Sequence, residues 1–593
     1  MILQALKQYY DRMKQDKEAQ LPEYGFSKEA IHFELLIDKE GNLIKVNSLK
    51  KEVRESAGGG KKSQRSVPII MDVPSTTKTD SRSGQTPPPN FLWDNSGFVL
   101  GMDAKGKAEK ALAKHKEFKK FHKEFAEKYQ IQDDEGMAAV LNFLKKWDSS
   151  KAPELEHWDE IEKGANLVFR LEADSLRYIH QRPRIVEAWK KYVPYAEEQY
   201  AKDAEKRGDG KSLNIRGVCL LTGSLTNLAR VHRKIGGVRY AQATGAAIVS
   251  FNEESYISYG KEQSLNSPIG IESAFAYTTA LNYLLSRDDR KIQIGDATTV
   301  FWADKETPME DWFSQMFNPQ QEDTSTLSDV RRFLESLRDG KKPKEIDGKT
   351  MFYILGLSPN ASRLSVRFWY AGTVEEISDK LGKHFRDIAI EKQYEKDKEF
   401  PGLWHLLVQT AVQGKTENIN PLLSGELARS ILTGSNYPLS MLSALISRIR
   451  ANEEINYLRA SMIKGILVRN YRKEVKMALD KENKEVPYLL GRLFAVLEKA
   501  QQDALGDINA TIKDKYYASS SATPSATFPV LLRLNKYHTS KGEHGNYYDT
   551  LNAEILEQLP AKKFPNHLTL DEQGLFAIGY YHQRNDFYKK KEK

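Results

Sequence analysis

The chain has 593 residues, more than one hydrophobic core usually serves, so about two to four domains are expected. Hydrophobic residues make up 40% of it, which excludes wholesale disorder because enough apolar surface is present to offset chain entropy. The 89 Lys and Arg residues outnumber the 81 Asp and Glu residues, and this net charge of +8 excludes a histone-like polycation but permits local basic surfaces.

The first 100 residues predict a helix, a β-hairpin and a long loop. Residues 1–13 mix apolar and charged side chains in a pattern typical of an amphipathic helix and not of a secretory signal. Apolar residues alternate between Ile31 and Val46 on both sides of a break at Gly41, which predicts a hairpin. Residues 50–89 hold few large apolar side chains outside 67–73, so we expect an exposed, mobile loop with one short strand.

Helices are expected over residues 105–147 and 151–210, where aromatic and aliphatic side chains mix with charged ones. The clearest strand signals come later in the chain. Met351–Leu357 form a continuous apolar run, and apolar residues alternate from Leu364 to Tyr370, which predicts a second hairpin. A helix over 374–393 should follow it.

Strand signals disappear beyond about residue 400, and wide apolar helical stripes replace them. The sequence therefore predicts an α+β protein with two parts. Residues 1–375 form a mixed region of β-hairpins and helices, and residues 376–593 form an all-α helical bundle. No apolar run approaches the roughly 20 residues that a membrane span needs, so we expect a cytoplasmic protein that does not bind a membrane.

Motifs for catalysis or cofactor binding fail on their spacing. Gly60-Lys61 and Gly414-Lys415 both lack the glycine five positions earlier that lets a loop wrap around phosphate. No HExxH or GxSxG sequence occurs. The single cysteine, Cys219, excludes disulfides within the chain, and its apolar neighbours predict a buried structural thiol rather than a nucleophile. We expect no cofactor and no enzyme activity, although separate segments can still assemble a metal site.

Two basic stretches contain glycines. Residues 50–66 hold six basic and two acidic residues, and residues 229–245 hold four Lys and Arg residues and no acid. Glycine lets the backbone approach a phosphate chain closely, and basic side chains with backbone amides can bind phosphates. An ordinary solvated surface has the same composition, so both interpretations stay open.

Seven longer stretches follow one another along the chain: MILQALKQYYDRM (1–13), PNFLWDNSGFVLG (89–101), IGGVRYAQATGAAIVSFNEESYISYGK (235–261), LGLSPNASRLSVRFW (355–369), RLFAVLEKAQ (492–501), ATIKDKYYASSSATP (510–524) and FAIGYYHQR (576–584). Together they resemble the large subunit of the type I-C CRISPR interference complex (Cascade), the Cas-eight family of subtype I-C. The resemblance covers essentially the whole chain.

The resemblance implies a component of an RNA-guided antiviral complex that also contains the CRISPR guide RNA and guide-processing, backbone and small subunits. Such a large subunit is expected near the guide's 5′ end. It recognises the protospacer-adjacent motif in double-stranded target DNA, promotes duplex opening and R-loop formation, holds the displaced strand and helps recruit the helicase–nuclease. Two alternatives stay open: a protein scaffold with little DNA contact, and a nuclease of the same system.

The family resemblance and the basic stretches together predict the residues that contact DNA. Phosphate contacts need Lys and Arg, and Asn can pair with base edges. Asn90 and Asn95 can alternatively brace the adjacent loop, with Trp93 as its anchor. The predicted DNA-binding residues are Lys50, Lys51, Lys61, Lys62, Arg65, Asn90, Asn95, Arg230, Arg233, Lys234 and Arg239.

The resemblance also implies that the C-terminal part can be translated separately, from an internal start, as the small subunit. Met477 is the candidate start, and it would yield 593 − 476 = 117 residues, from 477 to 593. Met462 is the alternative start.

Overall fold

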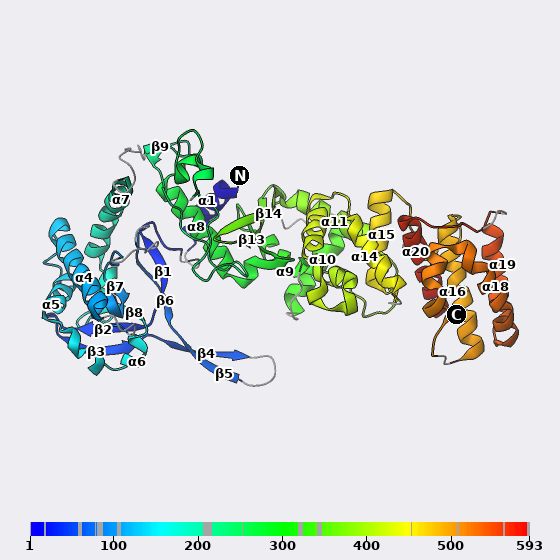
Figure 1. Ribbon diagram of the computed structural model, residues 1–593, viewed down its shortest axis with the longest axis horizontal. Coiled ribbons are helices and arrows are strands. Elements are labelled where there is room, and N and C mark those ends of the chain that lie inside the picture. Colours follow the sequence, from blue (N-terminus) through cyan, green and yellow to red (C-terminus); the bar gives the residue numbers. More distant parts are fainter. Residues whose placement is uncertain are drawn as a thin grey trace. The chain divides into compact units, whose positions relative to one another are not determined.

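The computed structural model describes the greater part of the chain (Figure 1), namely residues 2–16, 19, 21–56, 62–76, 79, 87–103, 108–205, 216–251, 253–317, 324–340, 347–451, 454–506, 509–560 and 564–589. The chain divides into two compact units. Leu3–Gly236 and Gln242–Tyr283 form the first unit, and Gly237–Ala241 with Leu284–Lys593 form the second. The division expected between residues 375 and 376 lies inside the second unit and stays a prediction.

The first unit contains a four-stranded sheet in the order β3-β2-β8-β7. The hairpin predicted from alternating apolar residues is confirmed: β2 (Phe33–Ile37) pairs antiparallel with β3 (Leu43–Ser48). β2 also pairs in parallel with β8 (Asn166–Leu171), which pairs antiparallel with β7 (Trp93–Asn95). β8 lies in a stretch predicted to be helical, so that prediction is wrong there; the strand is short and its partner β2 is distant in sequence.

Helices cover this sheet and meet in an aromatic core. Phe91 lies parallel to Trp189, with 5.1 Å between ring centroids, and Phe125 packs 4.2 Å from Phe91. The helices expected over 105–147 are confirmed as α4 and α5. The helices of the first unit are α1 (Ile2–Met13), α3 (Ser96–Val99), α4 (Ala108–Tyr129), α5 (Glu135–Lys146), α6 (Trp158–Ile161), α7 (Pro183–Glu205) and α8 (Ile271–Ser286).

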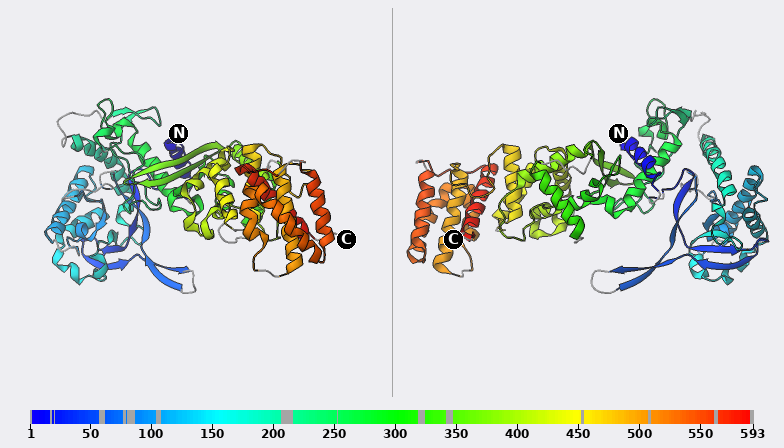
Figure 2. Two further views of the ribbon diagram at one scale, coloured as in Figure 1. Left: turned by 45° about the vertical axis from the view of Figure 1, so that its right-hand side comes forward. Right: turned by 180° about the vertical axis from the view of Figure 1, so that it is seen from behind.

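Much of the segment expected to be a loop, residues 50–89, is β-structure instead. β4 (Lys51–Ser56) and β5 (Lys62–Val67) form a two-stranded ribbon that reaches away from the sheet (Figures 1 and 2). The expected short strand is present as β6 (Ile69–Pro74), paired with β1 (Phe26–Ile31). The loop prediction is wrong at β4 and β5 because a ribbon can satisfy its backbone by pairing, without the apolar alternation that marks a half-buried strand.

The second unit begins with an antiparallel sheet in the order β11-β12-β13-β14. The predicted second hairpin is confirmed as β13 (Met351–Asn360) and β14 (Arg363–Thr373). β11 (Lys291–Ile294) and β12 (Ala297–Ala303) complete the sheet. The helix expected after it is α11 (Val374–Ile388), whose N-terminus is capped by Thr373 and Glu376 in a capping box.

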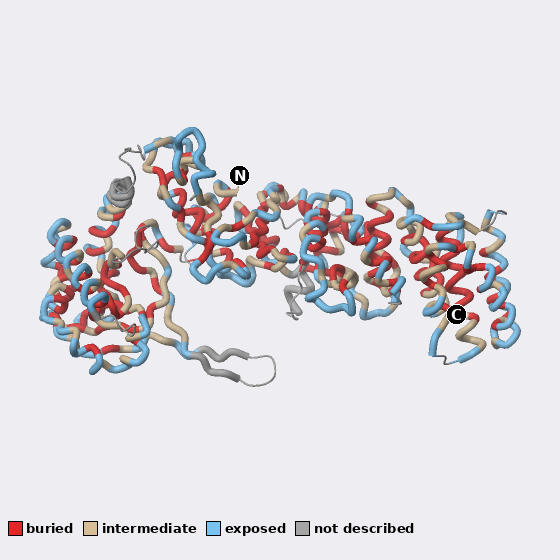
Figure 3. Tube along the Cα trace, in the orientation of Figure 1, coloured by how far each residue is buried: buried red, intermediate tan, exposed pale blue. Residues whose placement is uncertain are grey.

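The part of the chain that the structure describes beyond Thr373 contains helices and no strands, as predicted. α16 is buried along most of its length and packs against α17, α18, α19 and α20 (Figure 3). The helices of this unit are α9 (Met309–Phe317), α10 (Thr324–Arg338), α11, α12 (Leu403–Leu407), α13 (Pro421–Thr433), α14 (Leu439–Arg450), α15 (Tyr457–Tyr471), α16 (Val486–Leu505), α17 (Ile512–Ala522), α18 (Pro524–Lys541), α19 (Gly545–Gln558) and α20 (Leu570–Tyr588).

The two methionines considered as internal starts differ in their surroundings. Met477 lies between α15 and α16 and is exposed, whereas Met462 is fully buried within α15. A chain starting at Met477 would therefore contain α16 to α20 without cutting a helix. Translation from either methionine stays a prediction.

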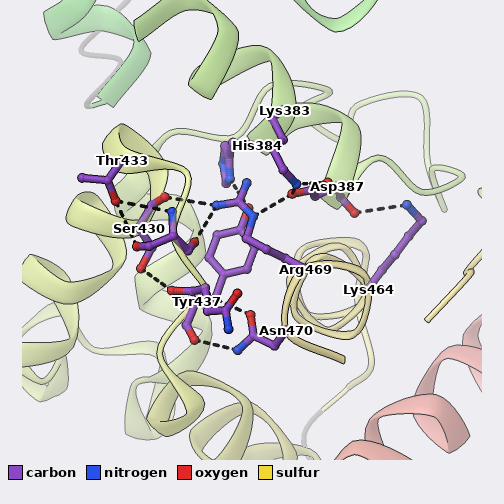
Figure 4. A network of polar contacts seen from close by, with 11 residues as sticks. Lys383, His384, Asp387, Ser430, Thr433, Tyr437, Lys464, Arg469 and Asn470 are labelled. Carbon is purple, nitrogen blue, oxygen red and sulfur yellow. Dashed lines mark hydrogen bonds and ion pairs between the residues drawn. The ribbon is translucent and has the colours of Figure 1, made fainter. Parts of the chain in front are cut away.

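A buried polar network joins α11, α13 and α15 (Figure 4). Arg469 Nε donates to Asp387 Oδ2 at 2.7 Å, and Arg469 Nη1 donates to the carbonyl oxygens of Ser430 at 3.1 Å and Ser435 at 3.2 Å. Lys464 Nζ donates to the Asp387 carbonyl oxygen at 3.1 Å. Burial lowers the pKa of Lys464 to about 8. These contacts tie three helices together through one carboxylate and one guanidinium.

Candidate nucleic-acid interface

The base of the β4–β5 ribbon holds two of the predicted residues, and they differ in their contacts. The Lys50 ammonium forms an ion pair with Glu160 and lies 5.2 Å from the centroid of the Phe33 ring. The Lys50 side chain is only 18% exposed. Lys51, the first residue of β4, is exposed. Lys50 therefore ties the ribbon to α6, and Lys51 presents its charge to solvent.

The other predicted cations of the ribbon lie on β5 or next to it. Lys62 begins β5 opposite Ser56, and Arg65 is paired with Val53. Lys61 lies outside the described residues, as do the side chains of residues 53–65. The backbone register places Lys51, Lys62 and Arg65 on two adjacent antiparallel strands. The ribbon pairs with no other described strand.

The NFLWDN motif follows β6 in the chain and packs into the first unit. The Asn90 N–H donates to Asp94 Oδ2 at 2.9 Å, and Asn90 is buried. Asn95 caps α3, with its Oδ1 accepting from the Gly97 N–H at 3.1 Å. Trp93 Nε1 donates to the Pro74 carbonyl oxygen at 2.8 Å, which anchors the end of β6. The Asn95 side chain braces the segment and Asn90 is buried in it, and the contact of both asparagines with DNA bases stays a prediction.

The second basic stretch is held against α8 in the first unit. The Arg233 guanidinium lies 4.7 Å from the centroid of the Phe275 ring. Asn282 Oδ1 accepts from the Gly236 N–H at 2.9 Å, and its Nδ2 donates to the Lys234 carbonyl oxygen at 3.2 Å. These two hydrogen bonds with Asn282 of α8 fix the backbone from Lys234 to Gly236. The Lys234 side chain is exposed.

Arg230 and Arg239 are the first and last basic residues of this stretch, and they differ in exposure. Arg230 Nε donates to Gln263, and Arg230 Nη1 is buried without a hydrogen-bond partner. Arg239 belongs to the second unit and is exposed. Its N–H donates to Thr298 Oγ1 at 3.0 Å, and its guanidinium lies 4.8 Å from the centroid of the Tyr240 ring. Of the four basic residues, Lys234 and Arg239 present their charge most openly.

The predicted residues thus form local groups: the ribbon, the NFLWDN motif and the stretch along α8. The prediction named cations and amides and omitted the tyrosines of residues 235–261, of which Tyr240 and Tyr259 are the most exposed. A signal for one of them was present in the sequence, since Tyr259 directly precedes Gly260 in a pattern typical of a tight turn.

Four histidines and the cysteine of the first unit are buried, namely His115, His122, His180, His232 and Cys219. His122 Nε2 accepts from the Leu92 N–H at 2.9 Å, and burial lowers the pKa of His122 to about 4. Cys219 is buried, as predicted. Burial raises the pKa of its thiol, but hydrogen bonds with the Gly270 and Leu221 backbone and with the Thr222 and Ser273 side chains outweigh this and lower the pKa to about 7.

The residues that the structure describes contain no group of three or more His, Cys, Asp or Glu side chains placed to hold a metal ion. Within the same ranges, no helix combines the length and apolar character needed to cross a membrane.

The chain matches the family model described as CRISPR-associated protein (Cas_Csd1) over residues 6–588. None of the curated proteins matches it significantly. The family match spans nearly the whole sequence, and the chain therefore belongs to the Cas_Csd1 family of CRISPR-associated proteins. The family implies a large-subunit role in CRISPR interference, within a multi-subunit complex that contains guide RNA and DNA.

Proposed function

We propose that the chain is the large subunit of a type I-C interference complex and has no catalytic activity of its own. It recognises the protospacer-adjacent motif, promotes duplex opening and R-loop formation, holds the displaced strand and helps recruit the helicase–nuclease. The family match supports the place in an interference complex. The β4–β5 ribbon is the observation that supports direct contact with DNA.

The ribbon has the two-stranded form, and its sequence the basic residues, that suit a DNA groove. The major groove of B-DNA admits a two-stranded β-ribbon, whose side chains can reach base edges while basic residues contact the phosphates. β4 and β5 form such a ribbon, paired with no other described strand, with exposed Lys51 at its base. Lys62 and Arg65 lie on the opposite strand from Lys51. We place motif recognition on this ribbon.

In this proposal the guide RNA and the protein have different roles in recognising the target. Base pairing between guide and target carries sequence recognition across the target, and the exchange of one duplex for another is nearly balanced in free energy. Protein contacts to the adjacent motif and the phosphates can therefore decide whether opening starts. Lys234 and Arg239 supply further exposed cations for phosphates.

The test compares target-DNA affinity of the guide-loaded complex with and without this chain. Each complex is measured on a duplex with an intact adjacent motif and on one with the motif scrambled. The chain should confer the preference for the intact motif. The complex that contains this chain but lacks the helicase–nuclease should leave matched DNA uncut in magnesium, and cutting would establish the nuclease alternative.

A charge-reversal variant locates the contact. Replacing Lys61, Lys62 and Arg65 with Glu should weaken binding at least tenfold and reduce the slope of log affinity against log salt by about 0.9 for each lost phosphate contact. The matched control reverses three exposed lysines of α4, namely Lys116, Lys120 and Lys123. Unchanged affinity and slope in the ribbon variant would place the contact elsewhere. Equal affinity for all duplexes with and without the chain would establish the scaffold alternative.

A further inference from the structure

Two tyrosines in the segment 235–261 lie with their rings in solvent. Tyr240 is 77% exposed and Tyr259 is 99% exposed. An aromatic side chain gains most from burying its large apolar surface, so a ring held in water contributes little to the fold. Residues 253–262 are exposed throughout, as Figure 3 shows for the loops that precede α8.

Both tyrosines also have a backbone conformation that tyrosine rarely adopts. Tyr240 has φ of 64° and is the third residue of a turn closed by the Ala241 N–H to the Val238 carbonyl oxygen at 3.1 Å. Positive φ at this position of a turn favours glycine. For a bulky residue it is an outlier that persists only where the surrounding structure maintains it.

The turn at Tyr259 shows the same mismatch. The Lys261 N–H donates to the Ser258 carbonyl oxygen at 2.9 Å, and Tyr259 and Gly260 have φ of 52° and 69°. Two consecutive positive φ values define a type I′ turn, whose first central position prefers Asn or Gly. Tyr259 therefore occupies an asparagine position without burying its ring.

The surrounding contacts fix each turn within its own unit. The Arg239 N–H is bonded to Thr298 Oγ1 at 3.0 Å, on the second unit's sheet. Asn266 Nδ2 donates to the Lys261 carbonyl oxygen at 2.7 Å in the first unit. Each turn thus presents a ring from a defined backbone rather than from a chain end.

Each ring also has a cation close to it in the chain. The Arg239 guanidinium lies 4.8 Å from the Tyr240 ring centroid, and Lys261 is exposed two residues after Tyr259. Proteins that bind single-stranded nucleic acid combine such aromatic platforms, on which bases stack, with basic residues that follow the phosphates. Duplex DNA offers no free base face, so an exposed ring suits a separated strand.

We propose that Tyr240 and Tyr259 are stacking platforms for unpaired bases of single-stranded DNA, with Arg239 and Lys261 contacting the adjoining phosphates. The proposal rests on the proposed function and specifies its ligand, because opening the target duplex leaves one strand with unpaired bases. It accounts for two features that folding alone does not explain: the exposed rings and the positive φ values.

The test measures binding of the full-length chain to a 15-nucleotide oligo(dT) and to an abasic strand of equal length and charge. Wild type should bind oligo(dT) at least about tenfold more tightly. The double variant Tyr240→Asn, Tyr259→Asn should lose this preference and keep the same salt dependence. Since Asn accepts positive φ better than Tyr does, the variant should melt at the same temperature as wild type or higher, so that misfolding cannot explain the loss.

Two further variants serve as controls. Tyr240→Phe with Tyr259→Phe keeps both rings and should keep the preference for oligo(dT). Tyr394→Asn removes a tyrosine that is 54% exposed, with Lys396 Nζ 5.5 Å from its ring centroid, and should change nothing.

Three results would overturn the proposal. Equal wild-type affinity for the two strands would mean that only phosphates are bound, leaving the proposed DNA contact intact. An undiminished preference in the Asn double variant would assign the stacking to other residues. Failure of the wild-type chain to bind either strand would contradict this inference and the holding of the displaced strand, whereas the contact of the β4–β5 ribbon with duplex DNA has its own test above.

Discussion

At the scale of single residues, one carboxylate holds two cations that differ greatly in exposure. Asp387 accepts from Arg469 at 2.7 Å and from Lys383 at 2.9 Å. The Arg469 side chain is 3% exposed and also lies 4.0 Å from the centroid of the Tyr437 ring, whereas the Lys383 side chain is 46% exposed. Water can solvate Lys383 if the ion pair is lost, but it cannot reach Arg469. Figure 4 shows both cations beside Asp387.

This asymmetry predicts that losing the Asp387 carboxylate and losing its exposed partner Lys383 lower the free energy of unfolding by very different amounts. Asp387→Asn leaves a buried guanidinium without its counter-charge and should lower the free energy of unfolding by roughly 3–5 kcal/mol. Lys383→Met removes an exposed partner and should cost about 1 kcal/mol or less. Urea unfolding followed by circular dichroism measures both. Similar losses in the two variants would contradict the role assigned to Arg469.

At the scale of secondary-structure elements, α16 and α20 are in backbone contact at two glycines. A Cβ atom placed on Gly491 would lie 2.0 Å from the Phe576 carbonyl oxygen, and one on Gly579 would lie 2.2 Å from the Tyr488 carbonyl oxygen. No side chain fits at either position unless the helices separate. This close approach brings the α20 core residues against α16 and holds the C-terminal helices together.

Gly491→Ala should therefore destabilise the second unit even though alanine is the better helix former. Forcing the two helices apart should cost at least about 2–3 kcal/mol, more than the roughly 1 kcal/mol that alanine contributes to a helix. Gly425→Ala in α13 is the matched control, because a Cβ there meets no described atom within 4 Å. The control should raise the midpoint of urea unfolding, and a rise with Gly491→Ala would contradict the close packing.

At the scale of the whole molecule, the histidines whose pKa burial lowers to about 4 or below are unequally divided between the two units. Burial lowers the pKa of each, to about 3 for His384 and to about 4 for the others. The first unit contains His115, His122, His180 and His232, and the second contains His384 and His582.

This distribution predicts that the first unit is the more sensitive to mild acid. Between pH 6.5 and about 4 the unfolded chain binds protons at these histidines and the folded chain does not, so the free energy of unfolding falls as the pH falls. Each group contributes up to about 1.4 kcal/mol per pH unit. Hydrogen exchange between pH 7 and pH 5, corrected for intrinsic rates, should show α4 losing protection before α16. Loss in the opposite order would contradict the prediction.

The sequence alone determined those features of the protein that depend on residues close together in the chain. Alternating side chains identified both confirmed hairpins, because the faces of a strand repeat every two residues. The helices after Thr373 followed from apolar stripes, and the capping box of Thr373 and Glu376 in the structure lies at the start predicted for α11. The burial of Cys219 followed from the apolar run around it, and the CRISPR-associated family followed from the order of long motifs.

Only the tertiary structure decided the features that depend on residues far apart in the chain. Lys50 is an ion-pair partner because Glu160 lies beside it, and β8 is a strand because β2 pairs with it. Asn90 is buried within a motif that packs into the aromatic core, and the exposure of Tyr240 depends on a turn fixed by Thr298. The physical reason is the same in each case: a side chain's exposure and partners are set by whichever segments fold against it, and local periodicity carries no information about those segments.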